Sequence, residues 1–454
     1  MKNKILLKGG YVVTMNEQSQ LFKQADVLIS DEVIAAIAPF IDAVDCEVID
    51  ATGMIVMPGF IDTHRHVWES LLRGIAGDYS LMEYLQNVLG PLAAAFRSKD
   101  VYVANLLGAL EALDAGITTV FDWSHIMNTP AHADSAITGL KDAGIRAVFG
   151  YGTPGTAVWD WFYESKLNHP QDIERICKQH FSSSNQLITL AMAIRGPEYS
   201  AFEVCDYDIR LARKLNLPMS MHVGCGSFAD KYKAIQKLDM AGLLNSDMNF
   251  AHCNFLSKND FKKLADHGCS VSITPEVEMQ MGLGFPATGK AMEAGISPSL
   301  GIDVVTGVGG DMFTQMRMAL QTERAIVNEQ LLNVGKMPQA LSLSMLDVLK
   351  MGTINGAKTL NLDKKIGSLE VGKQADLLLL NVDSLNLLPV INPVATIVAQ
   401  ANAANIDSVF VAGKAIKRKG KLLYPDLAHL KQQAKKSTQY LLKQTHIDLE
   451  MMIK

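Results

Sequence analysis

Short, continuously apolar segments alternate with longer amphipathic segments along most of the chain. Strands covered on both faces of a sheet are apolar at every position, whereas half-exposed strands alternate. Eight segments have this pattern, and helical stretches separate them; residues 257–268, for example, begin with a Ser cap and end on Gly. The eight predicted strands are Ile55–Asp62, Thr118–Asp122, Arg146–Gly152, Leu187–Ile194, Pro218–Val223, Asn249–Cys253, Ser270–Thr274 and Pro298–Asp303. Eight alternations over about 250 residues predict an α/β fold of the (β/α)8 TIM-type barrel class.

The two ends of the chain predict a second, smaller domain. Residues 1–57 contain apolar, β-branched runs interrupted by Gly-Gly and Asp-Glu, and the same texture returns after Leu362. Because these segments have no helices to connect parallel strands, we expect 1–57 and 363–424 to pair in a discontinuous β-sandwich domain. The barrel then occupies 58–362, and 425–454 form a helical tail with Leu at helical spacing. The alternative is a doubly wound open sheet, but no Gly-rich phosphate turn follows the first strand.

Composition excludes several classes of protein. The 454 residues carry 42 Lys and Arg against 47 Asp and Glu, a formal net charge of −5, so no nucleic-acid or anionic membrane surface is expected. Hydrophobic residues make up 48%, enough for a large core, yet the longest apolar runs fall short of the ~20 residues that span a bilayer. The six Cys are scattered without paired spacing. We therefore expect a cytoplasmic protein and not a secreted disulfide scaffold.

Histidines gather at the ends of the predicted strands, where barrels of this class carry their active sites. Five of the 11 histidines and one aspartate lie there: His64, His66, His125, His222, His252 and Asp303. His64 and His66 are two residues apart, so in an extended segment both side chains point to one face. Taken alone, this pair is more typical of surface or core histidines than of a metal site. With the other strand ends, the set of neutral imidazoles and one carboxylate predicts a catalytic Zn²⁺ or Fe²⁺ site.

Several motifs resemble those of the amidohydrolase superfamily. They span nearly the whole chain and include "PGFIDTHRH", "DAGITTVFDWSHI", "AHCNFLS", "PSLGIDVVTGVGGDMFTQMR" and "NGAKTLNLDKKIGSLEVGKQADLLLL". The resemblance is closest to the branch that contains cytosine deaminase, S-adenosylhomocysteine deaminase and atrazine chlorohydrolase.

This resemblance implies one divalent metal ion, Zn²⁺ first and Fe²⁺ as the alternative, held by His64, His66, His222 and Asp303. It also implies that His252 orients the substrate or the attacking water, and that Asp303 accepts a proton from that water and passes it to the leaving group. Two-metal branches of the family carry a carboxylated Lys on the fourth strand, and the fourth predicted strand has no Lys. Related enzymes suggest a homodimer or homotetramer.

One position departs from the deaminase pattern. In that branch a Glu follows the fifth-strand His by three residues and protonates a ring nitrogen, whereas this chain has Cys225 there. A thiol with a pKa near 8.5 is a poor substitute for a carboxylic acid. The candidate replacements are Glu69 and two residues of the altered seventh-strand segment "ITPEVEMQMG", of which we favour Glu276 over Glu278.

The expected substrate contacts are Trp68, His125, Arg195, Cys225 and Glu276. Aromatic rings at the barrel mouth stack on planar ligands, although they also pack in walls. The guanidinium of Arg195 suits a substrate carbonyl or carboxylate, and pairing with a neighbouring acid is its alternative role.

Together these features predict a metal-dependent hydrolase that attacks an electron-poor carbon of a nitrogen heterocycle and releases ammonia. One alternative is hydrolytic removal of halide or alkylamine from an s-triazine-like ring, which needs less help from ring protonation. An alternative of another class is a metal-binding homologue without turnover.

Overall fold

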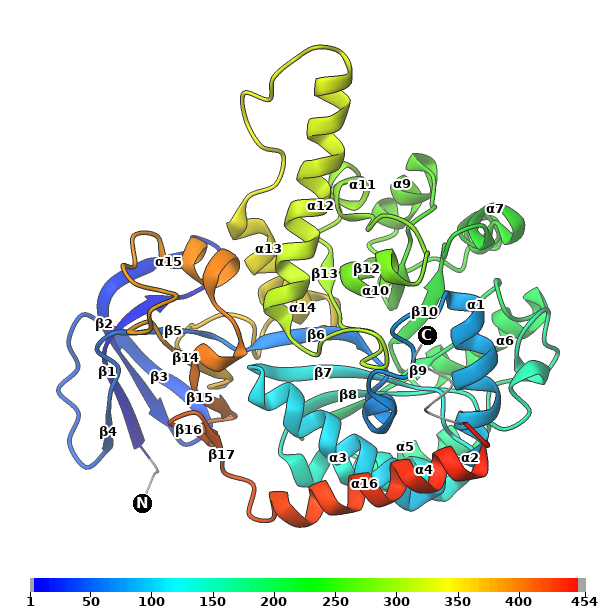
Figure 1. Cartoon of the computed structure of the whole chain (residues 1–454), viewed down its shortest axis with the longest axis horizontal. Helices are drawn as coiled ribbons and strands as arrows, with labels where there is room; N and C mark the ends of the chain where they lie inside the picture. Colours follow the sequence, from blue (N-terminus) through cyan, green and yellow to red (C-terminus); the bar gives the residue numbers. More distant parts are fainter. Residues whose placement is uncertain (1–3, 184, 448–454) are drawn as a thin grey trace.

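The computed structural model describes residues 4–183 and 185–447, and a parallel barrel lies at its centre (Figure 1). The barrel strands follow one another around the sheet in chain order. They are β6 (Phe60–Arg65), β7 (Ile117–Ser124), β8 (Arg146–Tyr151), β9 (Ile188–Ala193), β10 (Met219–Val223), β11 (Met248–His252), β12 (Ser270–Ile273) and β13 (Ser299–Leu300). Nearly every position in these strands is buried, which explains their uniform hydrophobicity. The predicted (β/α)8 barrel is confirmed.

The last strand returns to the first, and this contact closes the barrel. The backbone N–H of Asp303 donates to the carbonyl of His64 (2.8 Å), and the N–H of His66 donates to the carbonyl of Asp303 (2.9 Å). The hydroxyl of Thr63 donates to the carbonyl of Leu300 (3.0 Å). Closure therefore brings the ends of the first and last strands side by side.

Helices surround the barrel and cover its outer face (Figure 1). The longer ones are α3 (Ser98–Asp114), α4 (Pro130–Ala143), α5 (Asp172–His180), α6 (Phe202–Lys214), α8 (Ala234–Met240), α9 (Lys258–Asp266), α12 (Met312–Asn333) and α13 (Met345–Met351). The predicted cap is present on α9, where the Ser257 side chain accepts from the N–H of Asp260. Helix α12 extends beyond the body of the molecule (Figure 1).

Short helical segments occur in the loops between the longer elements. The α-helical ones are α1 (Leu81–Tyr84), α2 (Ala93–Ala95), α7 (Phe228–Tyr232), α10 (Pro275–Gln280), α11 (Thr288–Glu293), α14 (Ile354–Thr359) and α15 (Pro393–Ala395). The 3₁₀ and π segments are η1 (Val67–Leu72), η2 (Leu85–Leu92), η3 (Val158–Trp161), η4 (Thr396–Gln400) and η5 (Ala403–Asn405).

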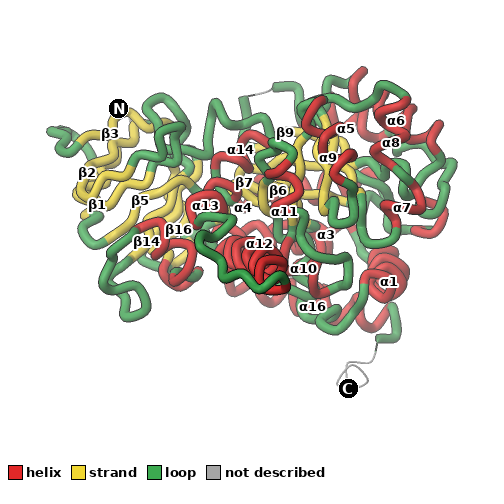
Figure 2. Tube along the Cα trace, turned by 90° about the horizontal axis from the view of Figure 1, so that it is seen from above, coloured by secondary structure: helices red, strands yellow, loops and turns green. Residues whose placement is uncertain are grey.

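A second sheet combines both ends of the chain beside the barrel (Figure 2). Its strands are β1 (Lys4–Val13), β2 (Leu21–Ser30), β3 (Val33–Ala38), β4 (Glu47–Asp50), β5 (Met54–Pro58), β14 (Leu377–Asn381), β15 (Ile406–Val411), β16 (Lys414–Arg418) and β17 (Lys421–Leu422). The two ends meet where β5 pairs antiparallel with β14, with Val56 opposite Leu379. The predicted pairing of the two ends is confirmed, and its strands form one mixed nine-stranded sheet.

The boundary between the two sheets lies at Gly59. The predicted strand Ile55–Asp62 divides there: β5 belongs to the terminal sheet and β6 to the barrel. A Cβ atom at Gly59 would lie 2.1 Å from Oγ1 of Thr118, so the two chain segments approach too closely for any larger residue. A uniformly apolar run does not reveal this division, because both strands are buried.

The C-terminal segment forms helix α16 (Leu427–Gln444), which packs on α3. The Ser437 hydroxyl donates to Asp100 (2.7 Å), and the Arg97 guanidinium lies 3.3 Å from the centre of the Tyr440 ring. The last part of the predicted tail, residues 448–454, lies outside the described residues, and the predicted domain boundaries stay a prediction. Within the described part of the chain, every helix is too short or too polar to cross a membrane.

Candidate metal centre and active site

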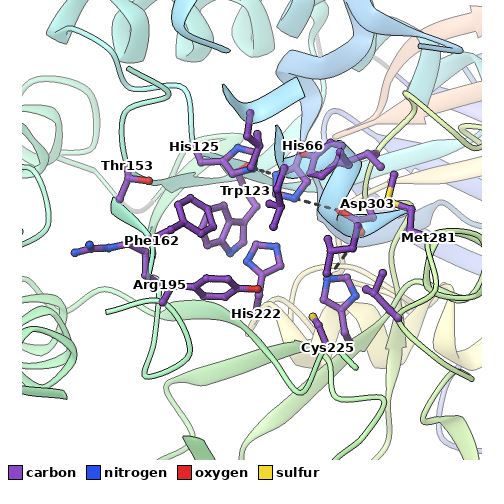
Figure 3. A pocket seen from close by; sticks show the side chains of 18 residues that line it. His66, Trp123, His125, Thr153, Phe162, Arg195, His222, Cys225, Met281 and Asp303 are labelled. Carbon is purple, nitrogen blue, oxygen red and sulfur yellow. Dashed lines mark hydrogen bonds and ion pairs between the residues drawn. The ribbon is translucent and has the colours of Figure 1, made fainter. Parts of the chain in front are cut away.

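Four side chains from distant parts of the sequence converge at the carboxyl ends of the barrel strands. Nε2 of His64 and Nε2 of His66 lie 3.4 Å and 3.2 Å from Oδ1 of Asp303. The ring of His222, from β10, lies 4.8 Å from the ring of His64, centre to centre. The structure thus brings together all four residues that the sequence analysis proposed as metal ligands. Figure 3 shows three of them, His66, His222 and Asp303.

The alternation of β6 explains why two of these histidines face inward. Arg65, the residue between them, points to the other side and pairs with Asp62 and Glu111. Asp62 also accepts from the backbone N–H of His64 (3.2 Å) and of Ile302 (3.1 Å), and so ties the two ligand-bearing segments together. Side chains two residues apart in a strand share a face, as the sequence predicts.

The donor set fits a divalent cation. Nδ1 of His66 donates to the carbonyl of Trp123 (2.6 Å), which leaves the lone pair of Nε2 directed at Asp303. Among the described residues, Nδ1 of His64 has no hydrogen-bond partner although it is buried. Burial lowers the pKa of His64 to about 4 and the pKa of His222 to well below its usual range. Both imidazoles are therefore neutral at pH 7 and offer lone pairs to a metal.

Asp303 is held in its reactive form and in an uncommon backbone conformation. Burial would raise the pKa of this carboxyl, but the neighbouring imidazoles of His64 and His66 outweigh burial and keep the pKa well below its usual range. Its φ is +68°, and that of His252 is +74°. Left-handed conformations cost energy in non-glycine residues and cluster at functional sites.

His252 lies beside Asp303, and its ring is oriented by the altered seventh-strand segment "ITPEVEMQMG". Its Nε2 lies 3.8 Å from Oδ2 of Asp303, and its Nδ1 lies 3.1 Å from the Thr274 hydroxyl and 3.3 Å from Oε1 of Glu278. The Glu278 carboxylate is fully buried and also accepts from the N–H of Thr274 (2.9 Å) and from Asn254 (3.1 Å). Glu278 is thus fixed on all sides against the candidate catalytic histidine.

Glu276 does not lie where the sequence analysis expected it. Its carboxylate accepts from the side chain of Gln315 (2.9 Å) on α12, and it is absent from the residues that line the pocket. Among the described residues, Glu278 does not line the pocket either, but it contacts His252 (3.3 Å). On the short helix α10, residues 276 and 278 point in different directions, and only Glu278 faces His252.

A pocket of about 660 Å³, part of it open to solvent, lies in front of the proposed metal ligands (Figure 3). Its inner part carries His66, His222, His252, Cys225 and Asp303. Its other lining residues are mostly aromatic or aliphatic: Leu81, Tyr84, Leu85, Leu89, Trp123, Phe162, Tyr199, Met281, Leu283 and Val304. A flat ring can enter between these side chains and reach the histidines.

The other expected substrate contacts have different positions. His125 and Cys225 line the pocket, and burial raises the pKa of the Cys225 thiol well above its usual range. Trp68 does not line it: its fully buried indole donates to Nδ1 of His125 (3.0 Å) and supports that ring. Arg195 lines the pocket, but its guanidinium donates to the carbonyls of Trp161 and Leu167. Its guanidinium also lies 3.5 Å from the carboxylate of Asp208, so the geometry matches its alternative role, pairing with a neighbouring acid.

Two buried carboxyl groups near the pocket complete the site. Glu69, a proposed replacement for the missing acid, accepts from the hydroxyl of Tyr84 (2.5 Å). Glu198, which the sequence analysis missed, accepts from the backbone N–H of Gly224 (2.8 Å), the residue before Cys225. Burial raises the pKa of each carboxyl to about 7. Glu198 lies beyond the end of the predicted fourth strand, in "RGPEYS", and only the fold places it beside the fifth.

Comparisons with known proteins agree with this geometry. The model of the amidohydrolase family matches residues 55–416. A 5-methylthioadenosine/S-adenosylhomocysteine deaminase of Pyrococcus furiosus is 29% identical over 92% of this chain and 96% of that relative. A 5'-deoxyadenosine deaminase of Methanobrevibacter smithii is 29% identical over 97% of this chain and 98% of that relative.

Solved structures with the same fold include enzymes that contain zinc. An adenosine deaminase from Xanthomonas campestris with bound zinc superimposes with a TM-score of 0.85, at 25% identity, over 97% of this chain and 99% of that one. An atrazine chlorohydrolase from Arthrobacter aurescens complexed with zinc gives 0.84 at 23% identity, over 96% of this chain and 100% of that one. The predicted enzyme class, hydrolases acting on C–N bonds other than peptide bonds, is confirmed. Since the family model covers well over half of the sequence, the chain belongs to the amidohydrolase family.

Proposed function

We propose that this protein is a metal-dependent aminohydrolase. It adds water to a ring carbon that carries an exocyclic amino group, and it releases ammonia. The observation that carries this proposal is the convergence of three imidazoles and one carboxylate at the inner end of a pocket lined by flat and apolar side chains. Relatives named as deaminases of adenosine derivatives make adenine nucleosides the first substrates to test.

The residues proposed to hold the metal are His64, His66, His222 and Asp303. A divalent ion bound there supplies a nucleophilic water at neutral pH, because coordination lowers the pKa of water from 15.7 towards about 7. Zn²⁺ is the first choice because similar structures contain it, and Fe²⁺ suits the same donors.

The remaining catalytic roles belong to two side chains, Asp303 and His252. Oδ1 of Asp303 faces the ligand histidines, whereas Oδ2 faces His252 and is the atom that accepts the proton of the attacking water. Asp303 then gives this proton to the amino group, which leaves as ammonia. His252 is held by Glu278 and Thr274 and orients the ring carbon and the water for attack.

The second candidate reaction is release of chloride or alkylamine from an s-triazine-like ring. The absence of a carboxyl group at Cys225 favours it, because these leaving groups depend less on protonation of a ring nitrogen. Metal-loaded protein should be assayed on adenine nucleosides, pterins, cytosines and triazines, with ammonia and chloride measured separately. Ammonia from at least one ring is expected, and chloride without ammonia would contradict the leading proposal.

One substitution tests whether the protein is an enzyme or a metal-binding homologue without turnover. Asp303→Asn should lower kcat/KM by about 10²–10⁴-fold, since the carboxylate that moves the proton is lost. Metal content should be measured for both proteins, because Asp303 is also a proposed ligand. A metal-loaded parent protein without turnover on the whole panel would favour the alternative of a non-catalytic homologue.

We also propose a cytoplasmic location and a homodimer or homotetramer. The six cysteines are unpaired, in keeping with a reducing compartment. Cell fractionation and sedimentation of the purified protein test these two proposals.

A further inference from the structure

Trp68 and His125 form a hydrogen-bonded pair beside the proposed metal centre. Nε1 of Trp68 lies 3.0 Å from Nδ1 of His125, and the indole is fully buried. An indole nitrogen carries a hydrogen and offers no lone pair, so it can only donate. Nδ1 of His125 is therefore the acceptor. Since the hydrogen bond of one ring nitrogen determines where the hydrogen of a neutral imidazole lies, this hydrogen is on Nε2.

The second nitrogen of this ring is left for the pocket. Nε2 of His125 has no hydrogen-bond partner within the part of the chain that the structure describes. His125 lines the pocket and is 8% exposed. Figure 3 shows its ring in the pocket wall next to that of His66. The side chain thus presents one N–H donor to whatever occupies the pocket.

The donor is held in a fixed position. The ring of His125 stacks on His66 with a centre-to-centre distance of 4.2 Å and an angle of 16° between the planes. Trp123 packs edge-on against it at 5.3 Å, and Trp68 is itself packed edge-on against Phe96 at 5.0 Å. A donor that is already fixed by its neighbours loses little conformational freedom when a ligand binds.

Two other strong donors on the pocket wall are already committed to the protein. The hydroxyl of Tyr84 donates to the carboxylate of Glu69, and the guanidinium of Arg195 donates to two backbone carbonyls. The thiol of Cys225 is only a weak donor. His125, against the proposed metal ligand, keeps an N–H that the protein does not use.

We propose that His125 binds the substrate through Nε2–H, with a ring nitrogen or carbonyl oxygen of the heterocycle as the acceptor, and that Trp68 is the positioning residue that fixes the hydrogen on Nε2. This inference rests on the proposed function and identifies a contact that determines its specificity. Because the ring of His125 stacks on His66, the bound acceptor lies beside the proposed metal centre. A ring with C–H in place of this acceptor leaves the N–H unpaired and binds more weakly.

Nuclear magnetic resonance tests the position of the hydrogen without any substrate. ¹⁵N spectra of the Zn²⁺-loaded protein, labelled in its histidines, distinguish a protonated from an unprotonated ring nitrogen, and the signals of His125 are those that His125→Gln removes. We expect a hydrogen on Nε2 and none on Nδ1. Trp68→Phe keeps an aromatic ring without the donor and should shift these signals towards a mixture of both tautomers. A hydrogen on Nδ1 in the parent protein, or unchanged signals in a folded Trp68 variant, would overturn the inference.

Two substitutions at one position test the contact itself. The side-chain amide nitrogen of Gln can take the place of Nε2, whereas that of Asn takes the place of Nδ1. His125→Gln therefore keeps a donor at the pocket, and His125→Asn removes it. Calorimetry on adenosine, pterin, cytosine and melamine gives the dissociation constants of the metal-loaded proteins. For the rings that the parent binds, we expect about tenfold weaker binding by the Asn variant, and the Gln variant should retain most of the affinity. Equal losses in both variants, or no loss in the Asn variant, would contradict the proposed contact.

Ammonia release separates this inference from the proposed function. If none of these rings releases ammonia, the proposed function fails, while calorimetry still compares the two variants. Where ammonia is released, His125→Asn should raise KM and leave kcat within about threefold of the parent value, with unchanged metal content. A lower kcat together with loss of metal would mean that His125 only supports His66. That result, or binding of none of these rings by the parent, would overturn the inference.

Discussion

Cys225 is the residue whose chemistry departs furthest from the deaminase pattern. It lines the pocket, is buried, and keeps its proton at neutral pH because burial raises the pKa of its thiol. A thiol in this state neither donates a proton readily nor accepts one. If ring protonation limits the reaction, restoring a carboxyl group here should increase the rate.

Cys225→Glu is therefore expected to raise kcat/KM on an aminopurine or aminopyrimidine by at least tenfold, within the range of general acid catalysis. Cys225→Gln is the matched control, because it has the same size without the acid. Initial rates of ammonia release under metal-saturating conditions measure both. If the Glu variant is no faster than the parent, another group already carries out ring protonation.

The buried carboxyl of Glu198 should influence how stability changes with pH. Its pKa is about 7 in the folded protein because of burial, against 4.5 for an exposed Glu. Between these values the unfolded chain releases the proton while the folded chain keeps it, so stability falls as the pH rises through this range. The contribution amounts to about 3 kcal/mol at most.

Glu198→Gln removes this titration and keeps an oxygen that can accept from the N–H of Gly224. Urea denaturation at pH 5, 6, 7 and 8 should show that the variant loses less stability than the parent between pH 5 and pH 8. Parallel curves for the two proteins would mean that the Glu198 carboxyl is ionised in the folded state.

At the level of secondary structure, the short helix α10 determines how His252 is held. Glu278 is its contact with the histidine, and Glu276 points to Gln315 instead. Removing an outer partner of a catalytic or metal-bound histidine typically costs 10–100-fold in activity or affinity. Glu278→Gln should therefore lower kcat by about 10–100-fold, with little change in metal content.

Glu276→Gln is the control on the same helix, two residues away, and should change kcat less than threefold. The pH profile of kcat should also shift in the Glu278 variant, because the carboxylate that faces Nδ1 of His252 loses its charge. An equal loss in both variants would indicate damage to α10, not a role in positioning the histidine.

The elements themselves differ in how far the sequence predicts them. The barrel strands are predictable because strands buried on both faces are apolar throughout. The proposed metal ligands are predictable because they lie at the carboxyl ends of such strands or just beyond them. Glu198 cannot be predicted from the sequence, because it lies in a loop and contacts Gly224 only through the tertiary fold. The roles of Trp68 and Arg195 depend on side-chain direction, which residue type and position do not determine.

At the scale of the whole molecule, a buried ion pair joins the two sheets. Arg146, at the start of β8, donates to both carboxylate oxygens of Asp376 (2.7 Å and 3.0 Å), which directly precedes β14. Asp376 also accepts from the backbone N–H of Ala412 (2.7 Å), beside β15. Both charged side chains are nearly inaccessible, at 5% and 2% exposure. Loss of one partner from such a pair is costly because it leaves a buried charge without compensation.

Asp376→Ala should consequently lower the free energy of unfolding by about 3–5 kcal/mol. The control is Glu47→Ala on the same terminal sheet, whose pair with Arg418 is largely exposed and contributes about 0–1 kcal/mol.

All four tryptophans, Trp68, Trp123, Trp159 and Trp161, belong to the barrel segment of the chain. Their fluorescence therefore reports on the barrel, whereas far-ultraviolet circular dichroism reports on both sheets. In urea, both signals of the Asp376 variant should shift together to lower denaturant concentration, since the pair couples the sheets. An early transition in circular dichroism with an unshifted tryptophan signal would mean that the terminal sheet unfolds independently.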